Sequence, residues 1–310
     1  MLALSDRLCR WLTRQNRNLP FIALATFSLP KTLVRSIYAA NQRKKLWGSS
    51  SACVTLSFDC DFPADAEALP DLAAKLRVLG IRASFAVVGC WVEKYPREHQ
   101  ALLDGGHEIV NHTYSHPDNE LLNPGRKFRT ISRDDKTEEI HRCHEICERI
   151  LGVSPRGLRV PHFKHLFTPE IYGILAELGY DFSSSTWLTN TTSRGLPFAA
   201  PGGVVEFPLA TCPSHPFTVF DTWHSLNATR LSHRIKHRGP RSYVALFREL
   251  IDMARLTGSY LNIYLDPLDV IKIEGFDDVL REISSTDLIL TTYGEYLDRG
   301  FHVAEAEVSL

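Results

Sequence analysis

The stretch CVTLSFDCD, residues 53–61, decides the fold. Apolar residues alternate here with smaller or polar ones, and the run ends on two carboxylates, Asp59 and Asp61. Such a run, with β-branched and aromatic members, predicts a buried strand. Residues two apart on a strand point to the same side, and two like charges held together are costly unless a cation or a proton lies between them. The alternative is a turn in which the two aspartates cap the next helix.

Downstream of Cys53, segments with strand-like and helical patterns alternate. The strand candidates are 53–58, 83–88, 107–110, 157–160, 181–185, 204–208, 260–265 and 287–291. The helical candidates are 65–79, 91–104, 135–151, 168–178, 241–257 and 275–284. Repeated β-α units imply parallel strands, and seven or eight of them favour an α/β barrel over an open sheet. In such a barrel, chemistry is expected at the carboxyl ends of the strands.

Composition and charge restrict the class of protein. Hydrophobic residues make up 44% of the chain and charged residues 23%, as in an ordinary globular protein. The net charge of −1 combines +8 in residues 1–45 with −9 in the rest, and an acidic body argues against nucleic-acid binding. Seven cysteines without paired spacing predict buried free thiols and a reducing compartment, so we expect a cytoplasmic protein.

Residues 1–48 are expected to form a basic amphipathic extension, separate from a catalytic domain at 52–300. The apolar run LPFIALATFSLP, residues 19–30, is too short to span a bilayer. Basic residues beside aromatic and aliphatic ones favour a helix lying on an anionic membrane surface. The alternative is an extension that is solvated or packed on the body. KKLWGSSS, residues 44–51, is predicted to be a linker.

The segment NHTYSH, residues 111–116, follows the third predicted strand. On a helical turn, His112 and His116 would project from one face and could bind one metal ion, although two unrelated histidines remain an alternative. Together with Asp61 they make two imidazoles and one carboxylate, a set that leaves positions open for water and substrate. Asp59 would then be placed to accept the proton of a water that attacks a carbonyl.

Five segments, taken in order, resemble those of the polysaccharide deacetylase (NodB-homology) family. They are SFDCD at 57–61, ASFAVVG at 83–89, GHEIVNHTYSH at 106–116, RVP at 159–161 and YDFSSST at 180–186. The likeness extends over about residues 52–292. It implies a distorted (β/α) barrel that hydrolyses the N-acetyl or similar small acyl group of an amino sugar through a metal-activated water.

The resemblance also implies roles for individual residues. A divalent metal, with zinc as the expected ion, would be held by Asp61, His112 and His116. Asp59 would be the general base, Arg159 would orient it through an ion pair, and Pro161 would line the substrate groove. An acetylated sugar or glycan is therefore the expected partner, together with an anionic membrane for residues 1–48. No oligomeric state is predicted.

The first departure from the family pattern is Cys60, which separates two aspartates that are commonly adjacent. The acid-x-acid form resembles a branch that includes some bacterial peptidoglycan and small-amide deacetylases. The metal is therefore assigned to Asp61 rather than to Cys60. Cys60 points to the opposite side of the strand and is expected to be buried in the wall.

The second departure is Asp266, which precedes Pro267 in YLNIYLDPLDV where the family normally has a histidine that acts as general acid. A carboxylate near a metal is a poor acid unless burial raises its pKa. Asp266 could act as the acid in a dry pocket, or a histidine could replace it, the candidates being His162, His165 and His224. A third alternative is a site that binds its ligand without efficient turnover.

Other candidates concern substrate binding. Long loops at 117–134 and 211–240 are expected to form substrate walls or lids. Stacking on sugar rings is predicted for Trp187, Phe217 and Trp223, and His224 is placed in the same groove; any of these, like His162, could instead be wall or core packing. The function favoured by the sequence is metal-dependent deacylation of an amino sugar, in a lipid-linked or envelope glycan. The alternatives are hydrolysis of another linear amide or a formamido sugar, and a degenerate barrel that only binds carbohydrate.

Overall fold

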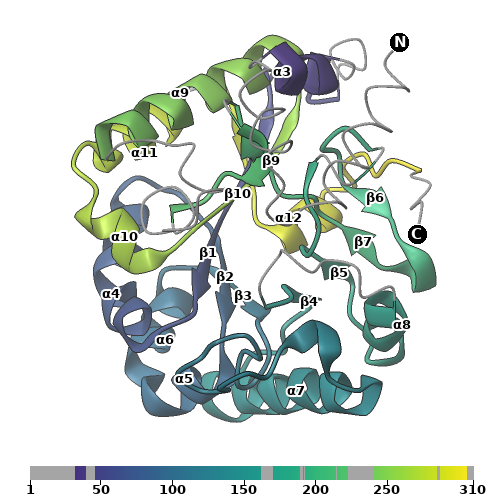
Figure 1. Ribbon diagram of the computed structural model, residues 1–310. Coiled ribbons are helices and arrows are strands. Elements are labelled where there is room, and N and C mark those ends of the chain that lie inside the picture. The colour runs from purple at the N-terminus through teal and green to yellow at the C-terminus, as the bar shows by residue number, and fades with distance from the viewer. Residues whose placement is uncertain are drawn as a thin grey trace.

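The computed structural model describes residues 32–39, 46–161, 170–188, 191, 193–213, 215–222, 240–284 and 287–305. One nine-stranded sheet curls through the molecule in the order β10-β1-β2-β3-β4-β5-β7-β6, and β11 also pairs with β1 (Figure 1). Its strands are β1 (Cys53–Cys60), β2 (Ser84–Val87), β3 (Glu108–Asn111), β4 (Gly157–Leu158), β5 (Phe182–Ser183), β6 (Phe198–Ala199), β7 (Val205–Glu206), β10 (Tyr260–Leu265) and β11 (Ile289–Leu290). The strands β8 (Thr211–Cys212) and β9 (His215–Val219) form a separate antiparallel pair.

The sheet is parallel except at β6, which runs antiparallel to β7. The α/β class and the parallel strands predicted from the sequence are therefore confirmed. Within the described ranges, the strand order does not close from β6 back to β10, so the sheet forms a curled half-barrel. Strands β4 to β7 are only two residues long, which leaves few ladder hydrogen bonds to complete a regular barrel.

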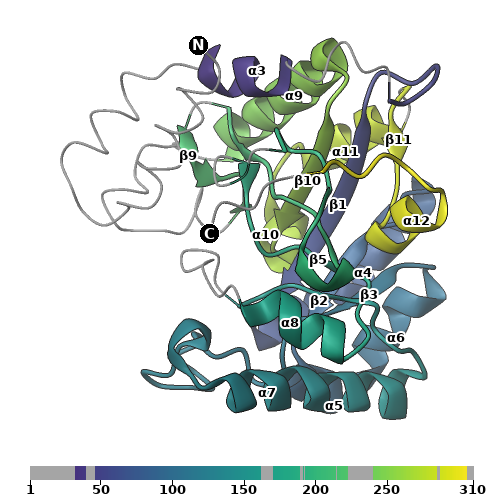
Figure 2. The same ribbon diagram turned by 90° about the vertical axis from the view of Figure 1, so that its right-hand side faces the viewer.

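Helices follow most of the strands and cover the outside of the curl (Figures 1 and 2). They are α4 (Pro63–Val78), α5 (Gly89–Lys94), α6 (Pro96–Asp104), α7 (Arg133–Ile146), α8 (Glu170–Glu177), α9 (Pro240–Thr257), α10 (Pro267–Lys272), α11 (Phe276–Ser284) and α12 (Tyr293–Asp298). The helix predicted at 91–104 is divided, because α5 ends at Lys94 and Pro96 starts α6 as its first residue. None of the described helices is long and apolar enough to cross a membrane.

Strand β1 separates an apolar side from a polar side. All eight of its residues are buried, and Val54, Leu56, Phe58 and Cys60 belong to the large core packed under α4, α9 and α11. The residues between them, ending with Asp59, therefore face the inside of the curled sheet. This alternation places Cys60 in the wall, as predicted. All six cysteines in the described part of the chain are free thiols, and five of them are buried.

The described residues of the segment before β1 pack on the body, which is one of the alternatives expected for the extension. Helix α3 (Thr32–Ala39) lies against α9 and contributes Val34, Ile37 and Tyr38 to the core (Figure 2). Trp47 is 5% exposed and donates its indole N–H to the Gly258 carbonyl at 2.8 Å. Its ring meets those of Tyr296 and Phe301 edge-on, with centroids 6.2 and 5.8 Å away. Helix α3 and Trp47 are thus packed on the body. Residues 1–31, for which the membrane-surface helix is predicted, lie outside the described residues.

Replacing Trp47 by alanine tests whether this segment is part of the folded body. Trp47→Ala should lower the free energy of unfolding by about 3–5 kcal/mol, because it leaves a cavity beside two aromatic rings. Leu256→Ala, at a side chain that is 59% exposed, is the control and should change stability by less than about 0.5 kcal/mol. Urea unfolding measures both, and equal, small effects would show that Trp47 belongs to a linker.

Candidate metal centre

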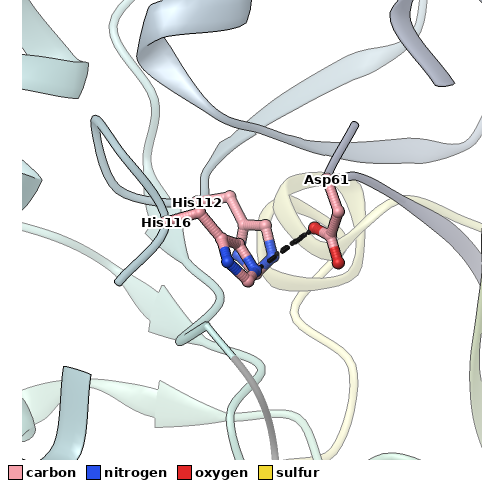
Figure 3. A group of neighbouring side chains, drawn as sticks. All are labelled: Asp61, His112 and His116. Carbon is pink, nitrogen blue, oxygen red and sulfur yellow. Dashed lines mark ion pairs between the residues drawn. The ribbon is translucent and has the colours of Figure 1, made fainter. Parts of the chain in front are cut away.

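Three side chains from the ends of two strands converge on one point (Figure 3). Asp61 directly follows β1, and His112 and His116 follow β3. One ligand atom from each lies within 4.8 Å of the others. Oδ1 of Asp61 is 3.1 Å from Nε2 of His112 and 3.4 Å from Nε2 of His116. The grouping predicted from the sequence is therefore present.

The backbone conformation that brings His112 and His116 together differs from the predicted helical turn. Residues 112–116 do not form a helical turn, because Thr113 (φ 67°) and His116 (φ 49°) have left-handed backbones. Side chains take up the backbone groups instead: Oδ1 of Asn111 accepts the Thr113 N–H at 2.8 Å, and Oγ1 of Thr113 accepts the His116 N–H at 3.1 Å. Such local hydrogen bonds compete with helix formation. The imidazoles still meet, with ring centroids 4.8 Å apart and planes inclined by 71°.

The chemistry of this cluster fits a divalent cation. His112 and His116 are 1% and 5% exposed, and Nε2 of each forms no hydrogen bond among the described residues. Buried polar atoms normally have partners, and a cation between the two rings would supply one. Nδ1 of His112 lies 2.7 Å from the Arg159 carbonyl and is placed to donate to it, which points Nε2 toward Asp61. Two imidazoles and one carboxylate suit zinc with positions left open.

The two histidines differ in their electrostatic surroundings. Burial lowers the pKa of His116 to about 4, so this imidazole is neutral and ready to bind a metal. Burial also acts on His112, but the nearby carboxylates of Asp59 and Asp61 outweigh it and raise the pKa of His112 above its usual value. Because a metal needs neutral imidazole, binding must displace the proton that these carboxylates favour on His112.

Asp59 lies next to the cluster and is held by Arg159. The guanidinium donates from Nη1 to Oδ1 of Asp59 at 2.5 Å, and both side chains are buried. Oδ2 of Asp59 is 3.9 Å from Nε2 of His112, so this carboxylate borders the cluster. Burial raises the pKa of Asp59, which favours its ability to accept a proton, while Arg159 supports the ionised form. The predicted ion pair is confirmed.

Asp266 directly follows strand β10, at the same edge of the sheet as Asp59. The parallel register pairs Phe58 with Leu265, so Asp266 follows β10 where Asp59 continues β1. Thr222 donates its hydroxyl to Oδ2 of Asp266 at 2.5 Å and accepts the Asp266 N–H at 2.8 Å. Burial, together with the carboxyl groups of Asp65 and Asp221, raises the pKa of Asp266 well above its usual value. The dry surroundings that an acid at this position requires are therefore present.

The remaining predicted residues have mixed outcomes. Pro161 is buried at the end of a described range. Trp187 is 4% exposed and packs with Leu209, Val219 and Tyr264, so its ring is part of the core and offers no open face for a sugar. The sequence pattern did not separate these two roles, since an aromatic beside a strand suits both. Four predicted residues lie outside the described residues: His162, His165, Trp223 and His224.

Sequence reasoning missed the polar groups around Arg159. Nη2 of Arg159 donates to Ser57 Oγ and to Ser184 Oγ, each at 2.9 Å, and to the hydroxyl of Tyr293. Asn262 completes this group by accepting the Tyr293 hydroxyl at 2.6 Å. Ser57 had a signal, since it lies two residues before Asp59 and shares its side of the strand. Tyr293 had none, because its contact depends on where α12 packs.

Comparison with known proteins gives a family for part of the chain. Residues 48–183 match the family described as polysaccharide deacetylase, a segment that holds both aspartates, both histidines and Arg159 but ends before Asp266. The peptidoglycan-N-acetylglucosamine deacetylase of Bacillus cereus is 33% identical over 113 residues, which are 36% of this chain and 37% of that protein. The chitooligosaccharide deacetylase of Bradyrhizobium is 28% identical over 131 residues, 42% of this chain and 54% of the relative.

The chain thus spans between a third and about half of the length of these curated relatives. Among solved structures, a protein assigned as a polysaccharide deacetylase from Mycobacterium smegmatis superposes with a TM-score of 0.66 at 19% identity. That match covers 84% of this chain and 94% of the other. At this identity the likeness concerns the fold, and it supports the distorted half-barrel described above.

Metal binding is the direct test of the cluster. The purified protein should hold about one equivalent of zinc, and His112→Ala and Asp61→Asn should each lose it, because each removes one of three ligands. Mass spectrometry of desalted protein measures the metal content. His141→Ala, at an exposed histidine, is the matched control and should retain the metal. A wild-type protein that takes up no metal under replete conditions would contradict the assignment.

Proposed function

We propose that this protein is a metal-dependent hydrolase that removes the N-acetyl group from an amino sugar in a glycan. One observation carries the proposal: Asp59, ion-paired to Arg159, lies beside the Asp61–His112–His116 cluster. This places a fixed carboxylate next to a group of metal ligands, which is the arrangement required for hydrolysis by an activated water.

The substrate class is inferred from the relatives. Two curated relatives are named for peptidoglycan N-acetylglucosamine and for chitooligosaccharides. Both names specify a glycan that contains N-acetylated glucosamine. We therefore infer N-acetylglucosamine within such a glycan as the substrate, with acetate and the free amino sugar as products.

Each residue of the site has its own role in the proposed reaction. When bound by Asp61, His112 and His116, a divalent metal supplies Lewis acidity toward the amide carbonyl and toward water. Asp59 accepts the proton of the water that attacks the carbonyl carbon. Arg159 keeps Asp59 oriented through the buried ion pair, so the carboxylate needs no rearrangement during the reaction.

The amine that leaves needs a proton, and Asp266 is the donor that the described residues support. It lies alongside Asp59 in the strand register, and burial favours its protonated form. A carboxylic acid kept neutral in an apolar site can serve as a general acid. Thr222 donates its hydroxyl to the carboxyl group of Asp266 and accepts the Asp266 backbone N–H, and these two hydrogen bonds together fix the orientation of the carboxyl group.

Acetate release from N-acetylated chitooligosaccharides and from peptidoglycan tests the reaction. Asp59→Asn should lower kcat by about 10²–10⁴-fold, because the base is lost, while the metal content stays at the wild-type level. Asp71→Asn makes the same change at an exposed site on α4 and should remain fully active.

Because Asp59→Asn leaves the Arg159 charge buried without its carboxylate, the double variant Asp59→Asn/Arg159→Met serves as a second test. This double variant lacks the unpaired buried charge of Arg159. It should also be inactive, and it should still bind the metal. Wild-type protein that binds metal but releases no acetate from either glycan would contradict deacetylation and favour another amide or a carbohydrate-binding role. Full activity in folded Asp59→Asn would contradict the role of the base.

Asp266→Asn tests the proton donor, because asparagine keeps the shape but cannot transfer the proton. We expect kcat to fall by about 10²-fold or more. An acid must be protonated to act, so wild-type activity should fall as pH rises through the raised pKa of Asp266. The pH profile of kcat should lose this alkaline fall in Asp266→Asn. An unchanged kcat would assign the donor to another group.

A further inference from the structure

The main-chain carbonyl of Asp61 has two unusual partners. The sheet ladder of β1 and β2 ends at the pair Cys60–Val87, so Asp61 lies just beyond the strand hydrogen bonds. Two side chains donate to its carbonyl instead: Nδ2 of Asn119 at 2.8 Å and the indole N–H of Trp91 at 3.0 Å. These contacts fix the backbone of a residue that the sheet leaves unsupported.

Asn119 also binds the backbone of a second ligand residue. Its N–H donates to the His116 carbonyl at 2.8 Å, which closes a turn over residues 116–119. Asn119 therefore connects the main chain of His116 with that of Asp61, which lies 58 positions before Asn119 in the sequence. Asn119 is 4% exposed, so water competes little for these hydrogen bonds.

The orientation of the Asn119 amide follows from its neighbours. Oδ1 accepts the N–H of Leu121 at 2.9 Å, and Nδ2 donates to the Asp61 carbonyl. A flipped amide would place its NH₂ against the Leu121 N–H and its oxygen against a carbonyl. The side chain thus performs two separable tasks, a local turn through Oδ1 and a link to Asp61 through Nδ2.

The ligand loop has a backbone that requires such support. Thr113, His116 and Asp118 have φ values of 67°, 49° and 122°. Only one other non-glycine residue in the described ranges, Arg194, has a positive φ. Backbone strain of this kind persists only where the surroundings hold it, and it concentrates at functional sites. The turn closed by Asn119 includes two of these residues, His116 and Asp118.

We propose that Asn119 is a positioning residue that sets the spacing between Asp61 and His116 and thereby the affinity for the metal. The inference rests on the proposed metal site. Nδ2 of Asn119 holds the Asp61 backbone, and the Asn119 N–H holds the His116 backbone, so the two ligands keep one separation. Loss of the Nδ2 link frees Asp61 to move relative to the two imidazoles. The indole N–H of Trp91 is the second donor to the Asp61 carbonyl.

Asn119→Ser separates the two tasks of the side chain. A serine hydroxyl can accept the Leu121 N–H and preserve the local turn, but it is too short to reach the Asp61 carbonyl. Zinc affinity should fall by about 10–100-fold, the range typical when a group that orients a metal ligand is removed. Competition with a fluorescent zinc chelator, using metal-free protein and zinc chloride, measures the dissociation constant without any assay of activity.

Two variants and one further measurement isolate this effect. Glu120→Ala removes the neighbouring loop hydrogen bond, in which Glu120 accepts the Gly125 N–H at 3.1 Å, and should leave zinc affinity unchanged. Trp91→Phe removes the other donor to the Asp61 carbonyl and should weaken zinc binding less than Asn119→Ser, because Asn119 remains. The thermal unfolding midpoint of metal-free Asn119→Ser should stay close to that of Glu120→Ala.

The outcomes separate this inference from the proposed function. Wild-type zinc affinity in Asn119→Ser, or an equal loss in Glu120→Ala, would overturn the positioning role and leave the metal site intact. A wild-type protein that binds no zinc would overturn both. Weakened zinc binding in Asn119→Ser with an unchanged midpoint, and an unchanged affinity in Glu120→Ala, would establish Asn119 as the link between the two ligands.

Discussion

The buried ion pair between Arg159 and Asp59 is the interaction on which the rest of the site depends. Both side chains are at most 2% exposed, and a charge in such a position is tolerated only when it is paired and hydrogen-bonded. Removing one member of a buried pair typically costs about 3–5 kcal/mol, because the other charge is left without compensation. Serine and tyrosine hydroxyls accept hydrogen bonds from Nη2 of the guanidinium, and the main-chain carbonyl of Ser184 accepts one from Nε at 3.3 Å. The pair therefore stabilises one arrangement of the strands around it.

The backbone of Arg159 connects this pair to the candidate metal cluster. Its N–H donates to the Asn111 carbonyl at 2.9 Å, and its carbonyl lies 2.7 Å from Nδ1 of His112. One residue after β4 thus orients both Asp59, the proposed general base, and His112, one of the proposed metal ligands. Asp59 and His112 are consequently positioned by the same residue, Arg159, although they come from β1 and from the loop after β3. This arrangement explains how short, two-residue strands can still define a fixed site.

Strand β1 supplies the second constraint. Its apolar residues pack outward under the helices, and this packing fixes which side chains face the interior of the curl. A slip of one residue would bring Phe58 and Cys60 to the site and bury Asp59 in the apolar core. The hydrophobic packing of the outer face therefore secures the chemistry of the inner face. Asp61, beyond the end of the ladder, is the exception, and side chains from α5 and from the loop after His116 hold it instead.

The sequence by itself determined the alternation of strands and helices, the side of β1 on which Asp59 lies, and the grouping of Asp61 with His112 and His116. These features depend on local periodicity and on the rule that parallel strands end at one edge. The tertiary structure alone decided the open curl, the left-handed loop at Thr113 and His116, the burial of Trp47 and Trp187, and the Asn119 link. Such contacts join residues far apart in the sequence, for example Trp47 and Gly258, which are 211 positions apart. No local sequence pattern specifies which distant residue will make such a contact.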